Sequence, residues 1–161
     1  MLQSFGLVRS NLLHHFIYKR PAYYAVQHLA GFFDDKVKPV GLLKGTSSCP
    51  REITVPGFEK EGTSVGLLWY GDKIPSDALK WDPVDLTIQG ASFRDPLYVE
   101  MITGKVHELD RSSRRKDPKA VSFTKLPVWD SPMMIVERSK VDLKRPRSGP
   151  RPQEEKGRGH P

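Results

Sequence analysis

Cysteine is almost absent from this sequence. The one residue of this type, Cys49, cannot form a disulfide within the chain, which is typical of proteins in a reducing compartment. Cys49 lies in the small polar segment 45–50 with no histidine nearby in the sequence, so we interpret it as an incidental loop thiol. The first ten residues also lack the basic start, apolar stretch and cleavage site of a secretory signal. A cytoplasmic location is therefore the default expectation.

Long hydrophobic runs are absent as well. Apolar residues make up 37% of the 161 residues, and no run approaches the roughly 20 residues that a helix needs to cross a bilayer. A chain of this length forms one ordinary domain with its own core, with room for a short appendage but not for a second full domain. We therefore expect no membrane partner.

Recognisable catalytic and cofactor motifs are missing. None of the five histidines has the spacing of a metal site, such as two at i and i+4 with a glutamate between them. There is no nucleophile elbow and no glycine-rich loop for phosphates. The paired carboxylates of a glycosidase cannot be recognised from spacing alone, and Glu100 and Glu108 occupy the polar positions of a half-exposed hairpin. The sequence therefore predicts no cofactor, no metal and no catalytic residue.

Positive charge is concentrated at the C-terminus. The net charge is +7, and segment 140–161 holds seven of the 26 basic residues but only three of the 19 acidic ones. This segment is rich in proline and glycine and has almost nothing apolar to bury, so we predict a disordered basic tail. Nucleic-acid binding with steep salt dependence is an alternative role for it, although a solvated tail is the favoured reading. The basic residues concerned are Arg145, Arg147, Arg151, Lys156 and Arg158.

One helix is predicted at residues 21–35. Pro21 presets the backbone for the first helical position, and good helix formers follow it. Apolar side chains cover a broad surface of this helix, among them Tyr23, Val26, Phe32 and Phe33. We therefore expect this helix to need a partner larger than the chain provides, or to drive self-association.

Beyond residue 36 the pattern changes to short apolar or alternating runs between turn residues, which is typical of an antiparallel β-sandwich. Thr103-Gly104 predicts a tight hairpin turn. A polar insertion is predicted at 74–81 and a mobile charged loop at 111–118. The predicted fold is thus mainly β, an antiparallel β-sandwich preceded by one α-helix and followed by a disordered tail. Eight strands are predicted, at 37–43, 52–55, 64–70, 84–88, 97–102, 105–109, 121–126 and 133–137.

Three groups of motifs suggest a family. They are FGLVR at 5–9 with RPAYYAVQ at 20–27, FRDPLYVE at 93–100 with TGKV at 103–106, and LPVWDSP at 126–132. They resemble the C-terminal end of TIM-barrel glycoside hydrolases, bacterial cellulase-like and xylosidase-like proteins included. In that family a short strand and a helix that begins near such a PAYYAV motif close the barrel, and a small β-sandwich packs beside it.

The resemblance implies three segments. Residues 1–36 would be a terminal strand and helix of a barrel, 37–139 an accessory β-sandwich domain, and 140–161 a tail without counterpart. The family's catalytic residues are carried by earlier barrel strands, which this chain is too short to contain. The resemblance therefore implies a non-catalytic segment with a structural or carbohydrate-contacting role, whose missing partner is the barrel.

A stand-alone carbohydrate-binding module is the alternative function. Trp69, Tyr70 and Trp81 are the candidate stacking rings for a polysaccharide or oligosaccharide. Trp69 alternates with Leu67, which favours a core position for it, because aromatic side chains fill cores before they form binding sites. Trp81, in the predicted polar insertion, is the best candidate for an exposed ring.

Overall fold

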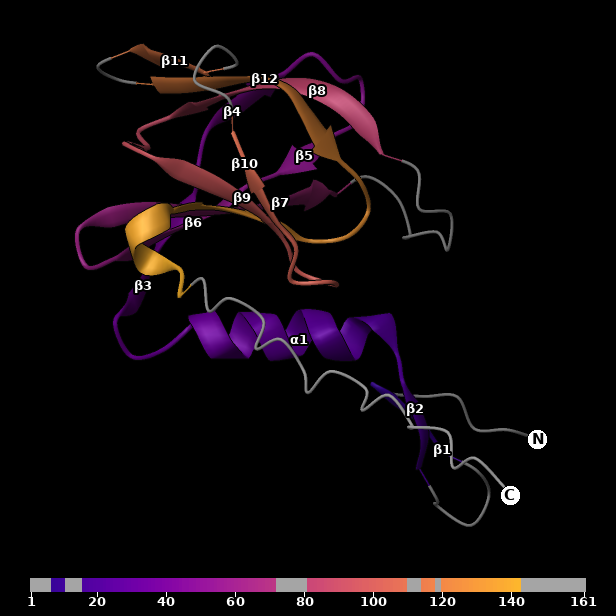
Figure 1. Ribbon diagram of the computed structural model, residues 1–161. Helices are drawn as coiled ribbons and strands as arrows, with labels where there is room; N and C mark the ends of the chain where they lie inside the picture. The colour runs from indigo at the N-terminus through magenta and orange to yellow at the C-terminus, as the bar shows by residue number, and fades with distance from the viewer. Residues whose placement is uncertain (1–6, 11–15, 72–80, 110–113, 118–119, 143–161) are drawn as a thin grey trace, which may run out of the picture.

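The computed structural model describes residues 7–10, 16–71, 81–109, 114–117 and 120–142. Within these ranges the chain is mainly β, with one α-helix near the N-terminus (Figure 1). The helix is α1 (Pro21–Phe32), and a 3-10 turn, η2, covers Arg138–Lys140. The strands are β1 (Val8–Ser10), β2 (Phe16–Lys19), β3 (Val37–Leu42), β4 (Gly45–Ser47), β5 (Ile53–Thr54), β6 (Pro56–Lys60), β7 (Thr63–Tyr70), β8 (Asp82–Gln89), β9 (Pro96–Glu100), β10 (Val106–Glu108), β11 (Arg114–Asp117), β12 (Ala120–Val128) and β13 (Met133–Glu137).

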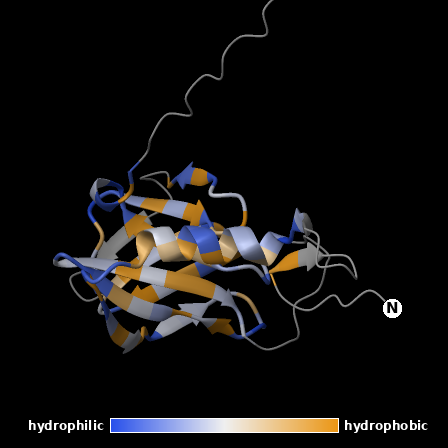
Figure 2. Cartoon of the chain, turned by 90° about the horizontal axis from the view of Figure 1, so that it is seen from below, coloured by the Kyte–Doolittle hydropathy of each residue, from blue (hydrophilic) through white to orange (hydrophobic). Residues whose placement is uncertain are grey.

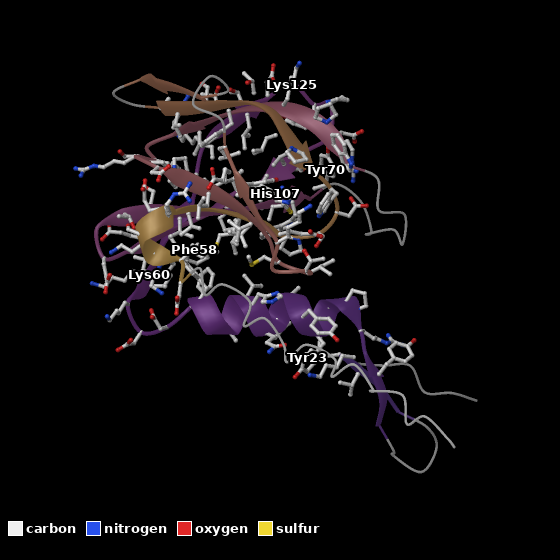
Figure 3. The ribbon with its side chains drawn as sticks, viewed as in Figure 1. Tyr23, Phe58, Lys60, Tyr70, His107 and Lys125 are labelled. Atoms are coloured by element: carbon white, nitrogen blue, oxygen red, sulfur yellow. The ribbon has the colours of Figure 1, made fainter. Side chains whose placement is uncertain are left out.

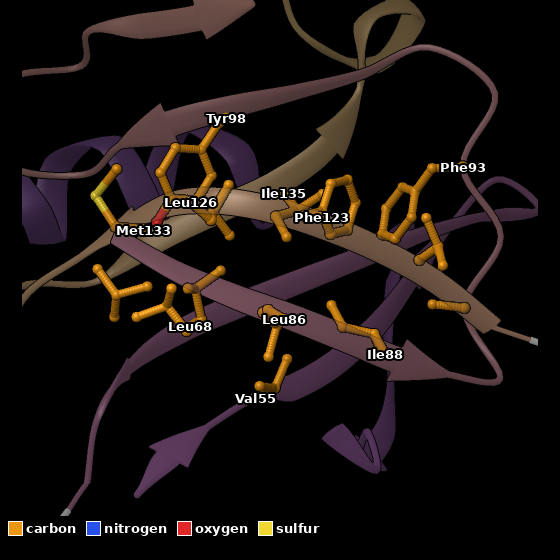
Figure 4. Packing of buried hydrophobic residues seen from close by; sticks show 14 of the residues in the cluster. Val55, Leu68, Leu86, Ile88, Phe93, Tyr98, Phe123, Leu126, Met133 and Ile135 are labelled. Atoms are coloured by element: carbon orange, nitrogen blue, oxygen red, sulfur yellow. The ribbon is translucent and has the colours of Figure 1, made fainter. Parts of the chain in front are cut away.

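Two antiparallel sheets pack face to face and confirm the predicted sandwich. The larger sheet has the order β10-β9-β13-β7-β6-β3, with β5 also paired to β7, and the smaller sheet has the order β11-β12-β8-β4. Leu68 and Ile135 of the larger sheet meet Leu86 and Phe123 of the smaller sheet in a dry core between them (Figure 4). All four side chains are at most 1% exposed, so this core supplies most of the hydrophobic stabilisation of the sandwich.

Helix α1 lies across the outer face of the larger sheet and forms a third layer (Figures 1 and 2). A second core forms between them, where Ala25 of α1 packs with Val65 and Leu67 of β7 and with residues of β9 and β13. Strand β7 is therefore buried on both faces, which explains its nearly continuous apolar run. The helix thus finds a partner for one of its faces within the chain.

Specific contacts anchor the C-terminal end of the helix. Near the C-terminal end, Lys60 Nζ donates to the main-chain oxygen of Phe32 at 2.7 Å, and its ammonium lies 4.4 Å from the centroid of the Phe32 ring. The ring of Phe58, labelled in Figure 3, meets the ring of Phe33 edge to face, with centroids 4.7 Å apart. These contacts leave Phe32 and Phe33 half-buried, whereas Val26 on another face of the helix is exposed.

The helix ends three residues earlier than predicted. Phe33 is already extended, and its N–H bonds the oxygen of Leu29 at 2.8 Å. The carboxylate of Asp34 then accepts the main-chain N–H of Lys36 at 3.1 Å, a local turn that competes with further helix. The change of direction brings the chain directly into β3.

All eight predicted strands are present, and the predicted hairpin turn is confirmed. Val106 of β10 pairs with Val99 of β9, and Gly104 in the connection has φ +70°. The predicted mobile loop at 111–118 is wrong in part, because β11 within it pairs with β12. A strand of charged residues at a sheet edge opposes pairing with other chains. Because β11 contains no apolar residue, the alternation that predicts a strand from sequence is absent there.

Four further strands lie outside the eight predicted ranges. Two of them, β1 and β2, form a small hairpin before α1, where the resemblance implied a single terminal strand, and β4 lies within the segment interpreted as a polar loop. The fourth, β6, begins with Pro56-Gly57, which looks like a turn in the sequence. Gly57 is needed there because an added Cβ would lie 2.5 Å from Leu43 Cγ. Close packing, rather than a turn, explains this glycine.

The start of the predicted tail belongs to the folded part. Lys140 Nζ donates to Glu61 Oε2 at 2.7 Å, and Val141 packs against the second core, between α1 and the larger sheet. Segments 72–80 and 143–161 lie outside the described residues, and with them the predicted disordered tail, its basic residues and most of the predicted polar insertion. No helix in the described part of the chain has the length and apolar character to cross a membrane.

Candidate functional site

A cluster of polar and aromatic side chains closes one end of the sandwich, and we call it the end cluster: Cys49, Arg51, Tyr70, Asp82 and Asp130. The Arg51 guanidinium lies 3.7 Å from the centroid of the Tyr70 ring. Its Nη2 donates to Asp130 Oδ1 at 2.9 Å, and the two side chains are 26% and 20% exposed. The guanidinium is therefore held between a ring face and a carboxylate while part of it is open to solvent.

Tyr70, labelled in Figure 3, makes contacts with three other members of the end cluster. Its hydroxyl donates to Asp82 Oδ2 at 3.3 Å and accepts a weak hydrogen bond from the Cys49 thiol at 3.7 Å. Burial, followed by the influence of Cys49 and Asp82, raises the pKa of Tyr70 above its usual value. The hydroxyl stays neutral at physiological pH, so the cluster is suited to fixed hydrogen bonding rather than to proton transfer.

Strand ends bring these residues together. Tyr70 is the last residue of β7, and Asp82 is the first of β8. Ile53 of β5 is the register partner of Tyr70, which places Arg51 beside the ring. Gly71, the next residue, packs closely against β5: an added Cβ at this position would lie 2.4 Å from Thr54 Oγ1. The connection from β12 to β13 contributes Asp130.

Two buried polar groups flank Asp130. Trp129 Nε1 and Ser131 Oγ are both buried and have no hydrogen-bond partner among the described residues. Buried donors are nearly always satisfied in native proteins. The turn 129–131 therefore carries hydrogen-bonding capacity that the described part of the fold does not use.

The three aromatic side chains predicted as a stacking platform are not brought together. Trp69 lies on the helix side of β7, half-buried against the second core, whereas Tyr70 points into the sandwich and is 3% exposed. Neighbours on a strand face opposite sides of the sheet, so these two rings cannot share one surface. Trp81 is 54% exposed. Of the three predicted rings, only Trp81 presents a large open surface.

Trp81 lies at the same end of the sandwich as the end cluster. It immediately precedes Asp82, and Asp82 pairs with Val128 across the β8–β12 ladder. Trp81 therefore lies next to the turn that begins at Trp129. Arg51 and Asp130 were not predicted as site residues, since 79 positions separate them and only the strand register brings them into contact.

A separate cleft of about 450 Å³ lies where the N-terminal part of α1 meets the β9–β10 turn. Its lining is mostly apolar and includes the side chain of Tyr24, which is 40% exposed. In the residues that the structure covers, no group of three histidine, cysteine or carboxylate side chains has the geometry to hold a metal. The lining residues of the cleft are Lys19, Pro21, Tyr24, His28, Ile102 and Thr103.

No family model, curated protein or solved structure matches this chain. The class that the fold defines is a two-sheet antiparallel β-sandwich with a helix layer on its larger sheet. Functional assignment therefore depends on the surfaces of this chain alone.

Proposed function

We propose that this chain is the accessory β-sandwich of a glycoside-hydrolase-like protein and that α1 is shared between the sandwich and a catalytic barrel. Its role is structural, and the catalytic carboxylates belong to the barrel. The observation that carries this proposal is the composition of α1. None of its twelve residues is charged, although seven of them are exposed.

A helix at a protein surface ordinarily carries charged residues on its outer face. The exposed residues of α1 instead include Ala22, Val26 and Ala30, spaced at i, i+4 and i+8, and Gln27 is the one polar side chain among the seven exposed residues. Small side chains let a second helix approach closely, at about 8–10 Å between axes. The outer face of α1 is therefore suited to contact with another protein layer rather than with water.

The preceding hairpin also exposes apolar side chains. Leu7, Val8 and Tyr18 are each at least 40% exposed, as are Tyr24 and Val26 of α1. Five of the eight large apolar side chains that are exposed in the described residues thus belong to segment 7–26. Exposed apolar side chains gathered in one segment of this kind are typical of an interaction site. We call the outer face of α1 together with Leu7, Val8 and Tyr18 the docking face.

A barrel is the partner that the sequence motifs favour. The motif at 20–27, by which the chain resembles glycoside hydrolases, covers the start of α1 and part of the docking face. In a TIM barrel the helices form an outer ring, so one helix contacts its neighbours laterally. A helix with one face on its own sandwich and an uncharged second face fits that position.

A double variant tests the proposal without weakening the helix. Ala22→Glu places an anion in the first turn of α1 and Ala30→Lys places a cation near its end, and both charges are favourable to the helix dipole. We expect unchanged thermal stability together with loss of dye binding and of self-association, measured by fluorescence and sedimentation. Gln89→Lys, at an exposed position of β8, is the matched control and should behave like the parent chain.

Two results would count against the proposal. One is a parent chain that is monomeric and binds no hydrophobic dye. The other is genomic: the DNA directly upstream should encode the remaining barrel, in frame or after a frameshift, and an unrelated gene there contradicts the assignment. Where a barrel is encoded, co-expression should yield a complex with the parent chain and none with the double variant.

A further inference from the structure

We infer that α1 pairs with α1 of a second copy of this chain, antiparallel and outer face to outer face, and that the two β1–β2 hairpins clasp the ends of this helix pair. The inference rests on the docking face of the proposed function but not on the barrel, since a second copy takes this face when no barrel covers it. Its support comes from the order of side chains along α1 and from the charges that flank the helix.

The outer face of α1 is centred on Gln27. Ala25 is the buried residue of this helix and packs on the larger sheet. At roughly 100° per residue, Gln27 lies almost opposite Ala25 around the helix axis. Gln27 is also close to the midpoint of α1, which spans Pro21–Phe32. In an antiparallel pair this amide therefore meets its own copy, and since an amide both donates and accepts hydrogen bonds, the two amides can bond each other.

Bulky and small side chains divide the outer face into complementary halves. Tyr23 and Tyr24 precede Gln27 in the helix. Ala30 and Gly31 follow it. Turning a second helix end for end about Gln27 brings Tyr23 opposite Gly31 of the copy. It also brings Tyr24 opposite Ala30. Large side chains thus face small ones along the pair, which allows the two helices to approach closely.

Gly31 is not required by its own chain. It is exposed and helical, and glycine is less favourable than alanine within a helix. An added Cβ at this position would find nothing within 4 Å, so no close contact in the described residues excludes a side chain. The ring of Tyr23 from a second copy needs this open space, which gives the glycine a role.

The charges that flank α1 have the reverse of the order that favours an isolated helix. Two cations, Lys19 and Arg20, precede its first residue. Two anions, Asp34 and Asp35, follow its end. Helix dipoles favour anions at the N-terminus and cations at the C-terminus. In an antiparallel pair each group lies beside the opposite end of the other helix, so the charges and the dipoles become complementary.

Lys19 and Asp35 form the principal pair of this kind. The Lys19 ammonium lies 4.4 Å from the centroid of the Tyr23 ring, which places the cation beside the outer face. Asp34 already bonds Lys60 Nζ at 3.1 Å, whereas Asp35 is exposed. Positions 19 and 35 are equally far from Gln27 in the sequence, so the antiparallel pair brings Lys19 of each copy to Asp35 of the other. A foreign partner would not require the two ends of one helix to match each other.

The β1–β2 hairpin stands where the end of the second helix lies in this pair. It leaves the N-terminal end of α1 on the side away from the larger sheet (Figures 1 and 2). Among the described strands, β1 and β2 pair only with each other, and Leu7 and Val8 are each 40% exposed. A twelve-residue helix is about 18 Å long, which is short for a standard interface of about 800 Å² per partner. The hairpin supplies additional apolar area.

A charge exchange tests the pairing by sedimentation equilibrium of the full chain. Lys19→Glu and Asp35→Lys should each weaken self-association about tenfold or more at low salt, because like charges then meet at both ends of the pair. An equimolar mixture of the two variants should associate like the parent, since each substituted residue meets the opposite charge on the other variant.

Gly31→Leu tests the fit of the two faces without weakening the helix. Leucine is a better helix former than glycine, so the melting temperature of the dilute variant should equal or exceed that of the parent. The leucine side chain fills the space for Tyr23 of the second copy and should weaken self-association about tenfold or more. Gln89→Leu adds the same side chain at an exposed position of β8. It is the matched control and should associate like the parent.

Three results overturn the inference: a parent chain that is monomeric at about 1 mM, an equimolar mixture that associates no better than either charge variant alone, and a Gly31→Leu variant that associates like Gln89→Leu. The proposed function fails separately. An unrelated upstream gene contradicts the barrel and leaves the pairing intact. Self-association that ignores the charge exchange removes the pairing and leaves the docking face to a barrel.

Discussion

His28 of α1 donates a hydrogen bond from Nδ1 to the main-chain oxygen of Met101, 2.7 Å away and 73 positions later in the sequence. A carbonyl can only accept, so this bond fixes the proton on Nδ1. Met101 begins the turn between β9 and β10, and the other edge of the imidazole faces Gly104 in the same turn. One histidine thus joins the helix layer to the predicted hairpin.

Gly104→Ala should destabilise the protein in two ways, by straining the backbone at a positive φ and by displacing the His28 ring. Gly104 has φ +70°, and an added Cβ would lie 2.8 Å from His28 Nε2. An L-residue in this conformation costs about 1–2 kcal/mol, and displacement of the imidazole weakens a hydrogen bond worth about 1 kcal/mol. We therefore expect a loss of about 2–3 kcal/mol in the free energy of unfolding, measured by denaturant titration.

Gly62→Ala is the control for this substitution. Gly62 has φ +75°, and an added Cβ would find nothing within 4 Å. The Gly62→Ala variant should lose only the free energy that the strained backbone costs. The difference in unfolding free energy between the two variants therefore measures the effect of displacing His28. Equal losses for the two glycines would show that the imidazole moves without cost.

The sequence was most informative where structure is local. Alternating apolar residues located all eight predicted strands, and Thr103-Gly104 located the hairpin, because strand burial and turn conformation act over a few residues. Pro21 and the helix formers after it were enough to predict the helix. The sheet that covers Ala25 and Leu29 could not be predicted as its partner, because this sheet is assembled from strands spread over the chain.

The candidate site was least accessible from the sequence. The prediction of Trp69 and Tyr70 in one platform ignored the alternation that sends them to opposite faces. Arg51 had no distinguishing neighbour in the sequence, and Asp130 looked like an ordinary turn residue. Only register places Arg51 beside the ring of Tyr70 and within 2.9 Å of Asp130. Sites formed by strand ends are set by topology, which short motifs do not encode.

Glu137→Ala should be among the most destabilising single substitutions outside the apolar core. The Glu137 side chain is 6% exposed, and its two carboxylate oxygens accept the main-chain N–H groups of Arg94 and Asp95. Removal leaves two donors without partners, at about 1–3 kcal/mol each. We expect a loss of about 2–4 kcal/mol in unfolding free energy, measured by chemical denaturation.

Glu108→Ala is the matched comparison for Glu137. The Glu108 side chain is 76% exposed and pairs with Arg138 at 3.0 Å. Exposed ion pairs contribute little to stability, so this variant should unfold at the same denaturant concentration as the parent. Similar losses for the two variants would contradict the role given to the buried carboxylate.

Two of the five tyrosines should resist ionisation in the folded protein. Burial raises the pKa of Tyr98, whose hydroxyl donates to the oxygen of Pro127 at 2.6 Å, and burial together with Cys49 and Asp82 raises the pKa of Tyr70. The unfolded chain ionises these groups near pH 10, so it binds fewer protons than the folded chain above that pH. Stability should therefore fall as pH rises through about 10.

Tyrosinate absorbance during alkaline titration measures this effect. Tyr70→Phe and Tyr98→Phe should each remove one late-titrating group and reduce the loss of stability at high pH. In denaturant all five tyrosines should titrate together. A folded chain in which all five titrate together near pH 10 would place the Tyr70 hydroxyl in water and remove it from the end cluster.

Glu61 should link stability to acid pH. Its carboxylate bonds Lys140 at 2.7 Å and Lys36 at 2.9 Å, and these two cations lower its pKa to about 2 from the usual 4.5. The unfolded chain binds this proton first as pH falls, so the contribution of Glu61 is fully present above about 4.5 and is lost between 4.5 and 2. Glu61→Gln should therefore flatten the stability profile in that window and leave its shape above pH 5 unchanged. The side chain is exposed, so salt at about 1 M should shrink the difference. Unfolding measured from pH 7 to 2 at low and high salt checks both effects, and a parent profile as flat as that of the variant would show that the two lysines do not hold Glu61 in solution.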